Sequence, residues 1–258
     1  MTPKAVVIGG LTKVFPSPNG LGQFTVIDSL NLEIGRGNFA SIVGPSGCGK
    51  TTLLNIIAGI ESYSSGEVRI MPQEGVETPA RIGYVFQSAR LLNWLTVEDN
   101  IKFALEAQEI DRKGWEERVR KYLDMVGLAG QERNYPLKLS GGMQQRVAIS
   151  RALAIEPDIL LMDEPFSHLD EITARKMRMD LTRILERARP TILFVTHSLR
   201  EAVFLSEDVY MMSARPARIF KHVRVNIPRP RHPEDPRLFD LEKDLVKEFF
   251  AVLEQERR

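Results

Sequence analysis

The sequence has little cysteine, no long apolar run and no excess of charge of either sign. Its one cysteine, Cys48, cannot form an internal disulfide, which fits a reducing compartment. No run of about 18 apolar residues occurs and the start does not fit a signal peptide, so we expect a cytosolic chain that does not span a membrane. The formal charge of +1 offers no global attraction to nucleic acid or to an anionic bilayer.

The pattern of apolar residues predicts strands that alternate with helices. Two β-rich stretches, 5–15 and 24–34, flank a segment rich in proline and glycine and predict a long hairpin. A buried strand is expected at 39–43 and a helix at 52–58. Further strands are expected at 66–71, 81–86, 159–162 and 191–196, a mostly helical lobe at 97–153, and a charged helix at 171–187. This order predicts an α/β fold with a mostly parallel sheet covered on both faces.

The C-terminal segment from about residue 215 is rich in proline. Pro216, Pro228 and the prolines that follow predict no regular structure through the middle of this tail. A terminal helix is expected beyond it, with one apolar face made of Leu238, Leu241, Leu245, Phe249 and Val252. Docking of this face on the chain's own domain is the favoured interpretation, and contact with a membrane or a partner is the alternative.

A glycine-rich loop lies between the strand at 39–43 and the helix that follows. It fits the pattern G-x-x-x-x-G-K-[ST] with Gly44, Pro45, Ser46, Gly47, Cys48, Gly49, Lys50 and Thr51. Inward-pointing N–H groups, the helix N-terminus and the Lys50 ammonium predict a polyphosphate site, and the Thr51 hydroxyl suits a magnesium ion. The helix N-terminus is also expected to lower the pKa of the Cys48 thiol, and bound nucleotide is expected to protect it from alkylation.

Four polar residues follow predicted strands at their carboxyl ends, where ligands bind in open α/β sheets. Asp163 is expected to hold Mg²⁺, and Glu164 to take a proton from an attacking water. The Gln87 amide oxygen is expected to reach the magnesium shell, and His197 to hydrogen-bond the γ-phosphate. Alone, each of these residues has an ordinary structural interpretation, and together they predict one nucleotide site.

The segment Leu139-Ser140-Gly141-Gly142-Met143 has no role in a generic phosphate-loop protein. With the preceding motifs it makes the chain resemble the ATPase subunit of an ATP-binding cassette (ABC) transporter, from the N-terminal hairpin through His197. The resemblance implies a P-loop NTPase core with an N-terminal antiparallel β-subdomain and an inserted helical subdomain. Residues 1–96 and 154–213 would form the core with the β-subdomain, 97–153 the helical subdomain, and 214–258 the tail.

The resemblance also assigns roles to residues by position. It makes Gly44 to Thr52 the Walker A loop, Gln87 the Q-loop, Asp163 and Glu164 the end of Walker B, and His197 the switch histidine. Leu139, Ser140, Gly141, Gly142 and Met143 become the signature, Ser167, His168, Leu169 and Asp170 the D-loop, and Phe15 the aromatic residue that stacks on adenine. In this set Lys50, Glu164 and His197 are the expected catalytic residues, and Thr51, Gln87 and Asp163 the expected metal ligands. Met143 replaces the usual glutamine and His168 the usual alanine.

In this family two cassettes enclose two ATP molecules, with the signature of one facing the Walker A loop of the other. The resemblance therefore implies a second ATPase subunit, Mg²⁺, and separate membrane permease subunits that place the chain at the cytoplasmic face of the membrane. Ser140-Gly141-Gly142 precedes a predicted helix whose N-terminal N–H groups suit a γ-phosphate, although the tripeptide alone could be a helix cap.

The segment after Gln87, the signature with Met143 and the tail at 226–231 are similar to importer ATPases for nitrate, sulfonates, taurine and bicarbonate. This similarity implies a periplasmic or extracellular solute-binding protein as a further partner. Leu92, Trp94 and Leu95 stand where the family docks its membrane partner, whereas Trp94 could equally fill the core of the helical lobe. A soluble cassette protein of translation or DNA repair, and a phosphotransferase, are the weaker alternatives, and no nucleic acid partner is expected.

Overall fold

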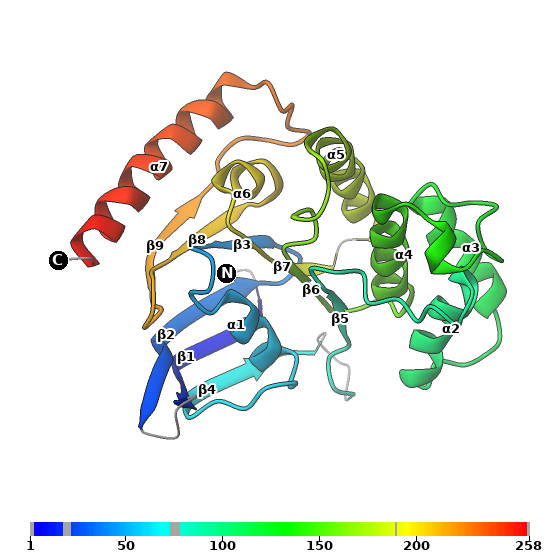
Figure 1. Ribbon diagram of the computed structural model, residues 1–258, viewed down its shortest axis with the longest axis horizontal. Coiled ribbons are helices and arrows are strands. Elements are labelled where there is room, and N and C mark those ends of the chain that lie inside the picture. Colours follow the sequence, from blue (N-terminus) through cyan, green and yellow to red (C-terminus); the bar gives the residue numbers. More distant parts are fainter. Residues whose placement is uncertain (1–2, 18–21, 73–77, 189, 257–258) are drawn as a thin grey trace. The chain divides into compact units, whose positions relative to one another are not determined.

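The computed structural model describes residues 3–17, 22–72, 78–188 and 190–256, which form two compact units (Figure 1). One unit comprises Met1–Met71 and Thr191–Arg258, and the other comprises Pro72–Pro190. Within the described residues, no helix combines the length and apolarity that crossing a membrane requires. The predicted subdivision into core, helical subdomain and tail stays a prediction.

The first unit begins with a three-stranded antiparallel sheet in the order β2-β1-β4. Strands β1 (Lys4–Pro16) and β2 (Gln23–Gly35) form the predicted hairpin, and β4 (Ser65–Ile70) pairs with the other edge of β1. Alternate side chains of β2 are buried from Leu30 onward, as expected for a strand with one face on the core. The hairpin prediction is therefore confirmed.

The same unit holds a parallel set of strands in the order β7-β3-β8, with β9 added antiparallel to β8. Every residue of β3 (Phe39–Val43), β7 (Thr191–Thr196) and β8 (Asp208–Met212) is buried, whereas β9 (Ile219–Arg224) is partly exposed. Helices α1 (Lys50–Ile57) and α6 (Leu199–Leu205) pack against these strands. Continuous apolar strands of this kind are typical of a parallel sheet covered by helices.

The second unit pairs two parallel strands and carries most of the helices. Strands β5 (Ile82–Val85) and β6 (Ile159–Asp163) pair in register from Ile82 with Ile159 to Val85 with Met162. Its helices are α2 (Val97–Ala107), α3 (Trp115–Met125), α4 (Gly141–Ala154) and α5 (Glu171–Ala188), with a 3-10 turn, η1 (Pro136–Lys138). Helices α2, α3 and α4 pack on one another, as expected for a mostly helical stretch at 97–153 (Figure 1).

The proline-rich tail contains more regular structure than the sequence predicts. Strand β9 occupies the proline-free stretch between Pro216 and Pro228 and pairs with β8, so the expectation of an irregular middle is wrong for this part. Proline excludes a strand only where its own missing N–H or fixed φ would interrupt the ladder. Strand β8 and helix α6 were also not predicted.

The terminal helix α7 (Pro236–Glu256) docks on its own unit. Leu238 and Leu245 are buried and Leu241 is half-buried, while the ring of Phe249 lies 6.0 Å from that of Phe220 on β9. Helix α7 also packs against α6. The apolar face predicted from the spacing is therefore the face that contacts the protein.

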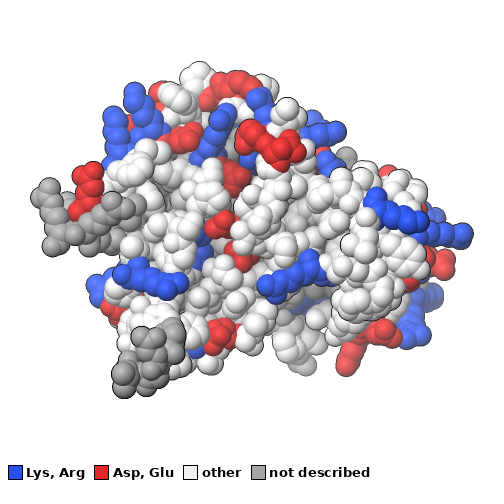
Figure 2. Space-filling model, viewed as in Figure 1, with Lys and Arg blue, Asp and Glu red and all other residues white. Residues whose placement is uncertain are grey.

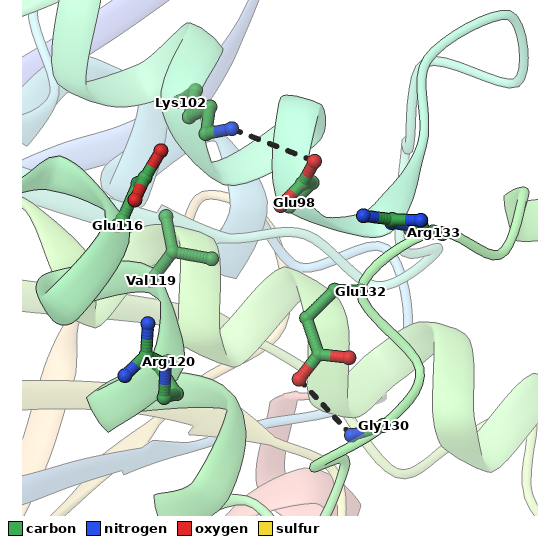
Figure 3. Close-up of a pocket in the computed structure, with 8 residues that line it drawn as sticks. All are labelled: Glu98, Lys102, Glu116, Val119, Arg120, Gly130, Glu132 and Arg133. Carbon is green, nitrogen blue, oxygen red and sulfur yellow. Dashed lines mark hydrogen bonds and ion pairs between the residues drawn. The ribbon is translucent and has the colours of Figure 1, made fainter.

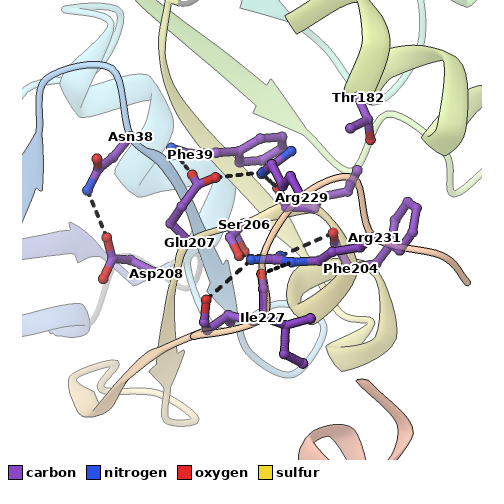
Figure 4. Close-up of polar contacts among 12 residues, drawn as sticks. Asn38, Phe39, Thr182, Phe204, Ser206, Glu207, Asp208, Ile227, Arg229 and Arg231 are labelled. Carbon is purple, nitrogen blue, oxygen red and sulfur yellow. Dashed lines mark hydrogen bonds and ion pairs between the residues drawn. The ribbon is translucent and has the colours of Figure 1, made fainter. Parts of the chain in front are cut away.

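Between β9 and α7, the chain is held by a buried arginine (Figure 4). The Arg231 side chain donates to the carbonyl oxygens of Val203, Phe204 and Ser206 at the end of α6, at 2.9, 3.2 and 2.7 Å. It also donates to Ile227 O at 2.9 Å and to Val225 O at 3.3 Å. Burial lowers the pKa of Arg231 to about 10, which still leaves it protonated at neutral pH. The segment 226–231 is thus fastened to the carboxyl end of α6.

Candidate nucleotide site

The predicted phosphate loop runs from the end of β3 to the start of α1, as its chemistry requires. Gly47 and Gly49 have φ values of 76° and 127°, in the region that favours glycine. A Cβ on Gly49 would lie 2.9 Å from Cγ1 of Val26, and one on Gly44 would lie 3.0 Å from Met212 O. The loop therefore needs glycine both for its backbone conformation and for its close packing.

Lys50 is the first residue of α1, and its side chain turns back into the loop. Its Nζ donates to Gly44 O at 2.9 Å and to Pro45 O at 3.1 Å, and the residue is 5% exposed. The residue before it, Gly49, has no side chain with which to cap the helix N-terminus. The first N–H groups of α1 and the Lys50 ammonium together supply positive charge at one end of the loop, which suits a polyphosphate.

The structure corrects the expectation for the Cys48 thiol. Burial raises its pKa, and the nearby charges of Lys50 and Arg215 oppose this rise without reversing it. The residue is 2% exposed, so desolvation of the thiolate outweighs the helix N-terminus. The prediction of a lowered pKa is wrong, and nucleotide is not needed to shield a thiol that the loop already covers.

His197 lies beside the start of the loop at the same edge of the sheet. Val43, the last residue of β3, pairs with Thr196, the last residue of β7, so Gly44 and His197 leave adjacent parallel strands. His197 is exposed, and its backbone is fixed because Ser198 caps α6. Thr51 is exposed and Thr52 half-buried in the first turn of α1.

Phe15 lies near the end of β1, opposite Phe24 on β2. The two rings are stacked with centroids 6.0 Å apart, and Lys13 Nζ lies 4.4 Å from the centroid of Phe15. Phe15 is half-buried, so part of its ring remains accessible to a flat ligand. The expected adenine stacking stays a prediction.

In the second unit, the expected acids follow β6. Asp163 is the last residue of β6 and is 5% exposed, and Glu164 is half-buried with φ at 40°. A left-handed backbone is costly for a glutamate and redirects the chain at the strand end. The pairing of Val85 with Met162 brings the end of β5, and hence Gln87, to the same edge as these acids.

Gln87 is joined to Glu164 through Ser167. Its Nε2 donates to Ser167 Oγ at 3.2 Å, and Ser167 Oγ donates to the carbonyl oxygen of Glu164 at 2.9 Å. His168 is exposed and Leu169 half-buried in the turn that follows. Asp170 ends this turn by accepting a hydrogen bond from Thr173 N at 3.0 Å, which caps α5 and lowers the pKa of Asp170. The structure thus brings the predicted Q-loop, D-loop and Glu164 together.

The predicted signature forms an exposed helix tip. Ser140 caps α4 by accepting from Met143 N at 3.3 Å, and Ser140 and Gly141 are exposed. Leu139 is buried, while Gly142 and Met143 are half-buried. A Cβ on Gly142 would lie 3.1 Å from Cγ2 of Thr173 on α5. The tripeptide is therefore a helix cap at an exposed position, so the two interpretations of the segment are compatible.

The loop after Gln87 is held by the buried Asn100 of α2 and the half-buried Arg151 of α4. Arg151 donates to Ala89 O at 3.1 Å and to Arg90 O at 3.0 Å. The Asn100 side chain accepts from Leu92 N at 2.8 Å, and its amide donates to the carbonyl oxygens at 92, 95 and 96. Trp94 is nevertheless 74% exposed, so it does not fill the core of the helical lobe.

Among the described residues, no three His, Cys, Asp or Glu side chains gather as a metal site. The predicted magnesium ligands do not require such a cluster, since they are one carboxylate, Asp163, the Thr51 hydroxyl and the Gln87 amide. Hard oxygen donors of this kind fit Mg²⁺ that is held partly by phosphate oxygens. Thr51 belongs to the first unit, and Gln87 and Asp163 belong to the second.

A pocket of about 440 Å³ lies in the second unit between α2, α3 and the segment 130–133 (Figure 3). Its lining is mixed in charge, with Glu98, Glu116, Glu132, Lys102, Arg120 and Arg133. No residue predicted to bind nucleotide lines it. Basic and acidic residues are likewise interspersed over the face in Figure 2, in keeping with the net charge of +1.

Comparison with known families and proteins identifies the family and the fold of the chain. The family model described as ABC transporter matches residues 27–167, which include the phosphate loop, Gln87, the signature and the two acids after β6. The chain belongs to the ABC transporter family. It is an ATPase of that family, which confirms the resemblance and the predicted fold class.

Several relatives are similar to this chain over most of its length. An ABC transporter ATP-binding protein of Methanocaldococcus jannaschii is 45% identical over 224 residues, 87% of this chain and 83% of the relative. The aliphatic sulfonates import ATP-binding protein SsuB of Bacillus cereus is 38% identical over 244 residues, 95% of each chain. A second such protein, SsuB 2 of Burkholderia cenocepacia, is 42% identical over 88% of this chain and 83% of its own.

Solved ABC cassettes share the fold. The dimeric ABC transporter cassette MJ0796 superposes with a TM-score of 0.74 at 30% identity, covering 86% of this chain and all of that one. A post-hydrolysis dimer of the same cassette bound to ADP and phosphate gives a TM-score of 0.73 at the same identity and coverage. The predicted resemblance to the importer subgroup is confirmed by the SsuB relatives.

Proposed function

We propose that this ABC ATPase energises an importer of aliphatic sulfonates or of a similar small solute such as nitrate, taurine or bicarbonate. The observation that carries this proposal is the similarity to the sulfonate import protein SsuB, which spans 95% of both chains. A match of 244 residues must include most of the tail as well as the catalytic motifs. The ATPase would act at the cytoplasmic face of the membrane, with permease subunits and a solute-binding protein outside.

Hydrolysis in this proposal takes place between two copies of the chain. The exposed tip at Ser140 and Gly141 on one copy would meet the triphosphate held by the loop and Lys50 of the other. The dimers of the cassette MJ0796 support this arrangement. Bound Mg²⁺ would neutralise phosphate charge, with Thr51, Gln87 and Asp163 as the residues to hold it.

Glu164 is the proposed general base for the attacking water. Its backbone position is fixed by φ at 40° and by the hydrogen bond from Ser167 to its carbonyl oxygen. Since Ser167 also accepts from Gln87, any movement of the Q-loop would reach the residue that takes the proton. His197, which follows the end of β7, would hydrogen-bond the γ-phosphate.

Trp94 is the proposed anchor for the permease. It is 74% exposed in a loop whose backbone is fastened by Asn100 and Arg151, so an apolar side chain is presented on a rigid support. Rigid exposed aromatic residues are frequent centres of protein interfaces because they lose little conformational freedom on binding. A loop pinned to α4 would also transmit force from the permease to the Ser140 tip.

The test is uptake by proteoliposomes that contain the ATPase together with candidate permease subunits. We expect ATP-dependent accumulation of a radiolabelled alkanesulfonate, supplied with its binding protein, and no accumulation with the Glu164→Gln variant. ATP hydrolysis without uptake of sulfonate, taurine, nitrate or bicarbonate would refute the proposed transport function. Uptake of one of the other three solutes would select the substrate within the proposal.

A further inference from the structure

Arg215 lies in a turn that packs beside the phosphate loop, and sequence reasoning did not single it out. The turn joins β8 to β9 and is closed by hydrogen bonds from Ser213 N to Arg218 O at 2.9 Å and from Arg218 N to Ser213 Oγ at 3.0 Å. It is also attached to β2, since Ala217 N donates to Val26 O at 2.9 Å and Asp28 N donates to Ala217 O at 3.1 Å. The backbone that carries Arg215 is therefore held at both sides.

Close packing joins this turn to the loop. A Cβ on Gly44 would meet Met212 O, just before the turn, at 3.0 Å, and one on Gly49 would meet Val26 Cγ1 at 2.9 Å. At the tip of the loop, a Cβ on Gly47 would lie 3.9 Å from Nη2 of Arg215. The guanidinium thus lies within ordinary contact range of a side chain that would replace Gly47.

Arg215 carries a charge that no acidic side chain pairs with among the residues that the structure describes. Its side chain is exposed. Arg218, three residues on, is by contrast paired with Asp28. The positive field of Arg215 is felt inside the loop, where it acts to lower the pKa of Cys48 against the larger effect of burial.

Arg215 also lies near Phe24, one of the two stacked rings of the hairpin. Its guanidinium carbon is 6.0 Å from the ring centroid of Phe24, and that ring stacks with Phe15, the predicted adenine contact. A group placed near both Gly47 and Phe24 stands between the two ends of a nucleotide bound as predicted. An exposed arginine at such a position is suited to phosphate oxygens, which it can bind through two N–H groups.

We propose that Arg215 is a further nucleotide-binding residue of this ATPase, whose guanidinium pairs with phosphate oxygens of ATP at the outer rim of the 44–51 loop. The inference rests on the proposed role of that loop and adds a second cation to it. Lys50 is buried and fixed by two carbonyl groups, whereas Arg215 reaches the loop from outside. Arg215 would therefore act on affinity for the charged part of the nucleotide.

The experiment measures binding of ATP, ADP and adenosine to the full chain by displacement of a fluorescent methylanthraniloyl-ATP. We expect Arg215→Met to weaken ATP and ADP about 10-fold, as for the loss of one charge-assisted hydrogen bond at an exposed site, and to leave adenosine unchanged. The KM for ATP should rise in parallel. Arg218→Met is the matched control, because it removes a similar side chain of the same turn and should bind as the wild type does.

Three results separate the inference from the function on which it rests. If Lys50→Ala loses ATP binding but Arg215→Met keeps wild-type affinity for ATP, the role of Arg215 is overturned. The same holds if Arg215→Met loses no more ATP affinity than Arg218→Met does. If Arg215→Met loses as much affinity for adenosine as for ATP, the proposed pairing of Arg215 with phosphate is overturned. Wild-type affinity in Lys50→Ala overturns the proposed loop function itself. If Arg215→Met fails to fold by circular dichroism, Arg215→Gln is measured in the same way and with the same criteria.

Discussion

Replacing Arg231 by methionine tests whether a buried cation holds the C-terminal segment in place. Methionine keeps an unbranched apolar side chain of similar length and removes every donor. The carbonyl oxygens of Val203, Phe204 and Ser206 would each lose an N–H partner, and they lie at the end of α6, where no later turn of helix can replace it. The 226–231 segment would also lose the bonds to its own carbonyl groups.

The magnitude follows from the number of acceptors left unpaired. Each buried carbonyl without a partner costs about 1 kcal/mol or more, and three of them at the end of α6 give about 3 kcal/mol. Loss of a positive charge at a helix C-terminus adds about 0.5 kcal/mol or more. Relief of the desolvation that lowers the pKa of Arg231 offsets part of this total. We therefore expect a loss of about 3 kcal/mol in the free energy of unfolding.

Thermal unfolding followed by circular dichroism measures the change. For a chain of this size, about 3 kcal/mol corresponds to a decrease in Tm of about 6–12 °C. Arg237→Met is the control, since Arg237 pairs with Asp235 at the surface and its removal should shift Tm by about 1 °C or less. A Tm for Arg231→Met within experimental error of that control would refute the reasoning.

The remaining predictions concern the site. Glu164→Gln should lower ATP turnover by about 10²- to 10⁴-fold and retain nucleotide binding, and unchanged turnover would remove Glu164 as general base. Lys50→Ala should weaken binding of methylanthraniloyl-ATP itself, because it removes the ammonium from the loop; wild-type affinity would contradict this. Iodoacetamide should label Cys48 slowly with or without ATP, since the thiol is buried and its pKa is raised. Rapid labelling of the folded protein would contradict both the burial and the raised pKa. Asn100→Leu should increase deuterium exchange at residues 92–96 around Trp94, and unchanged exchange would show that Asn100 does not hold this loop.

Most of the elements could be predicted because the local pattern and the global fold agree. The hairpin, the buried strand at 39–43 and the apolar face of α7 each follow from periodicity within a single segment. The strand-loop-helix order of the phosphate loop was evident for the same reason. Strand β9 was missed because nearby prolines dominated the interpretation, although none of them lies within it.

What could not be predicted depends on residues that are far apart in the chain. The pKa of Cys48 is set by burial in the folded loop, and no local pattern gives the balance between desolvation and the helix N-terminus. The loop that exposes Trp94 is held by Asn100 and Arg151, which hydrogen-bond to backbone atoms of that loop. Arg215 reaches Gly47 across about 170 residues of sequence, so its role becomes visible only in three dimensions.

The hydrogen bond at the start of α4 constrains what Ser140, the serine of the predicted signature, can recognise. Since Ser140 Oγ already accepts from Met143 N, its lone pairs are partly engaged while its hydroxyl proton stays available. The hydroxyl therefore favours partners whose oxygen atoms accept a hydrogen bond and donate none. An alanine here would remove the helix cap and this polarity together, whereas a threonine would keep both and add only a methyl group.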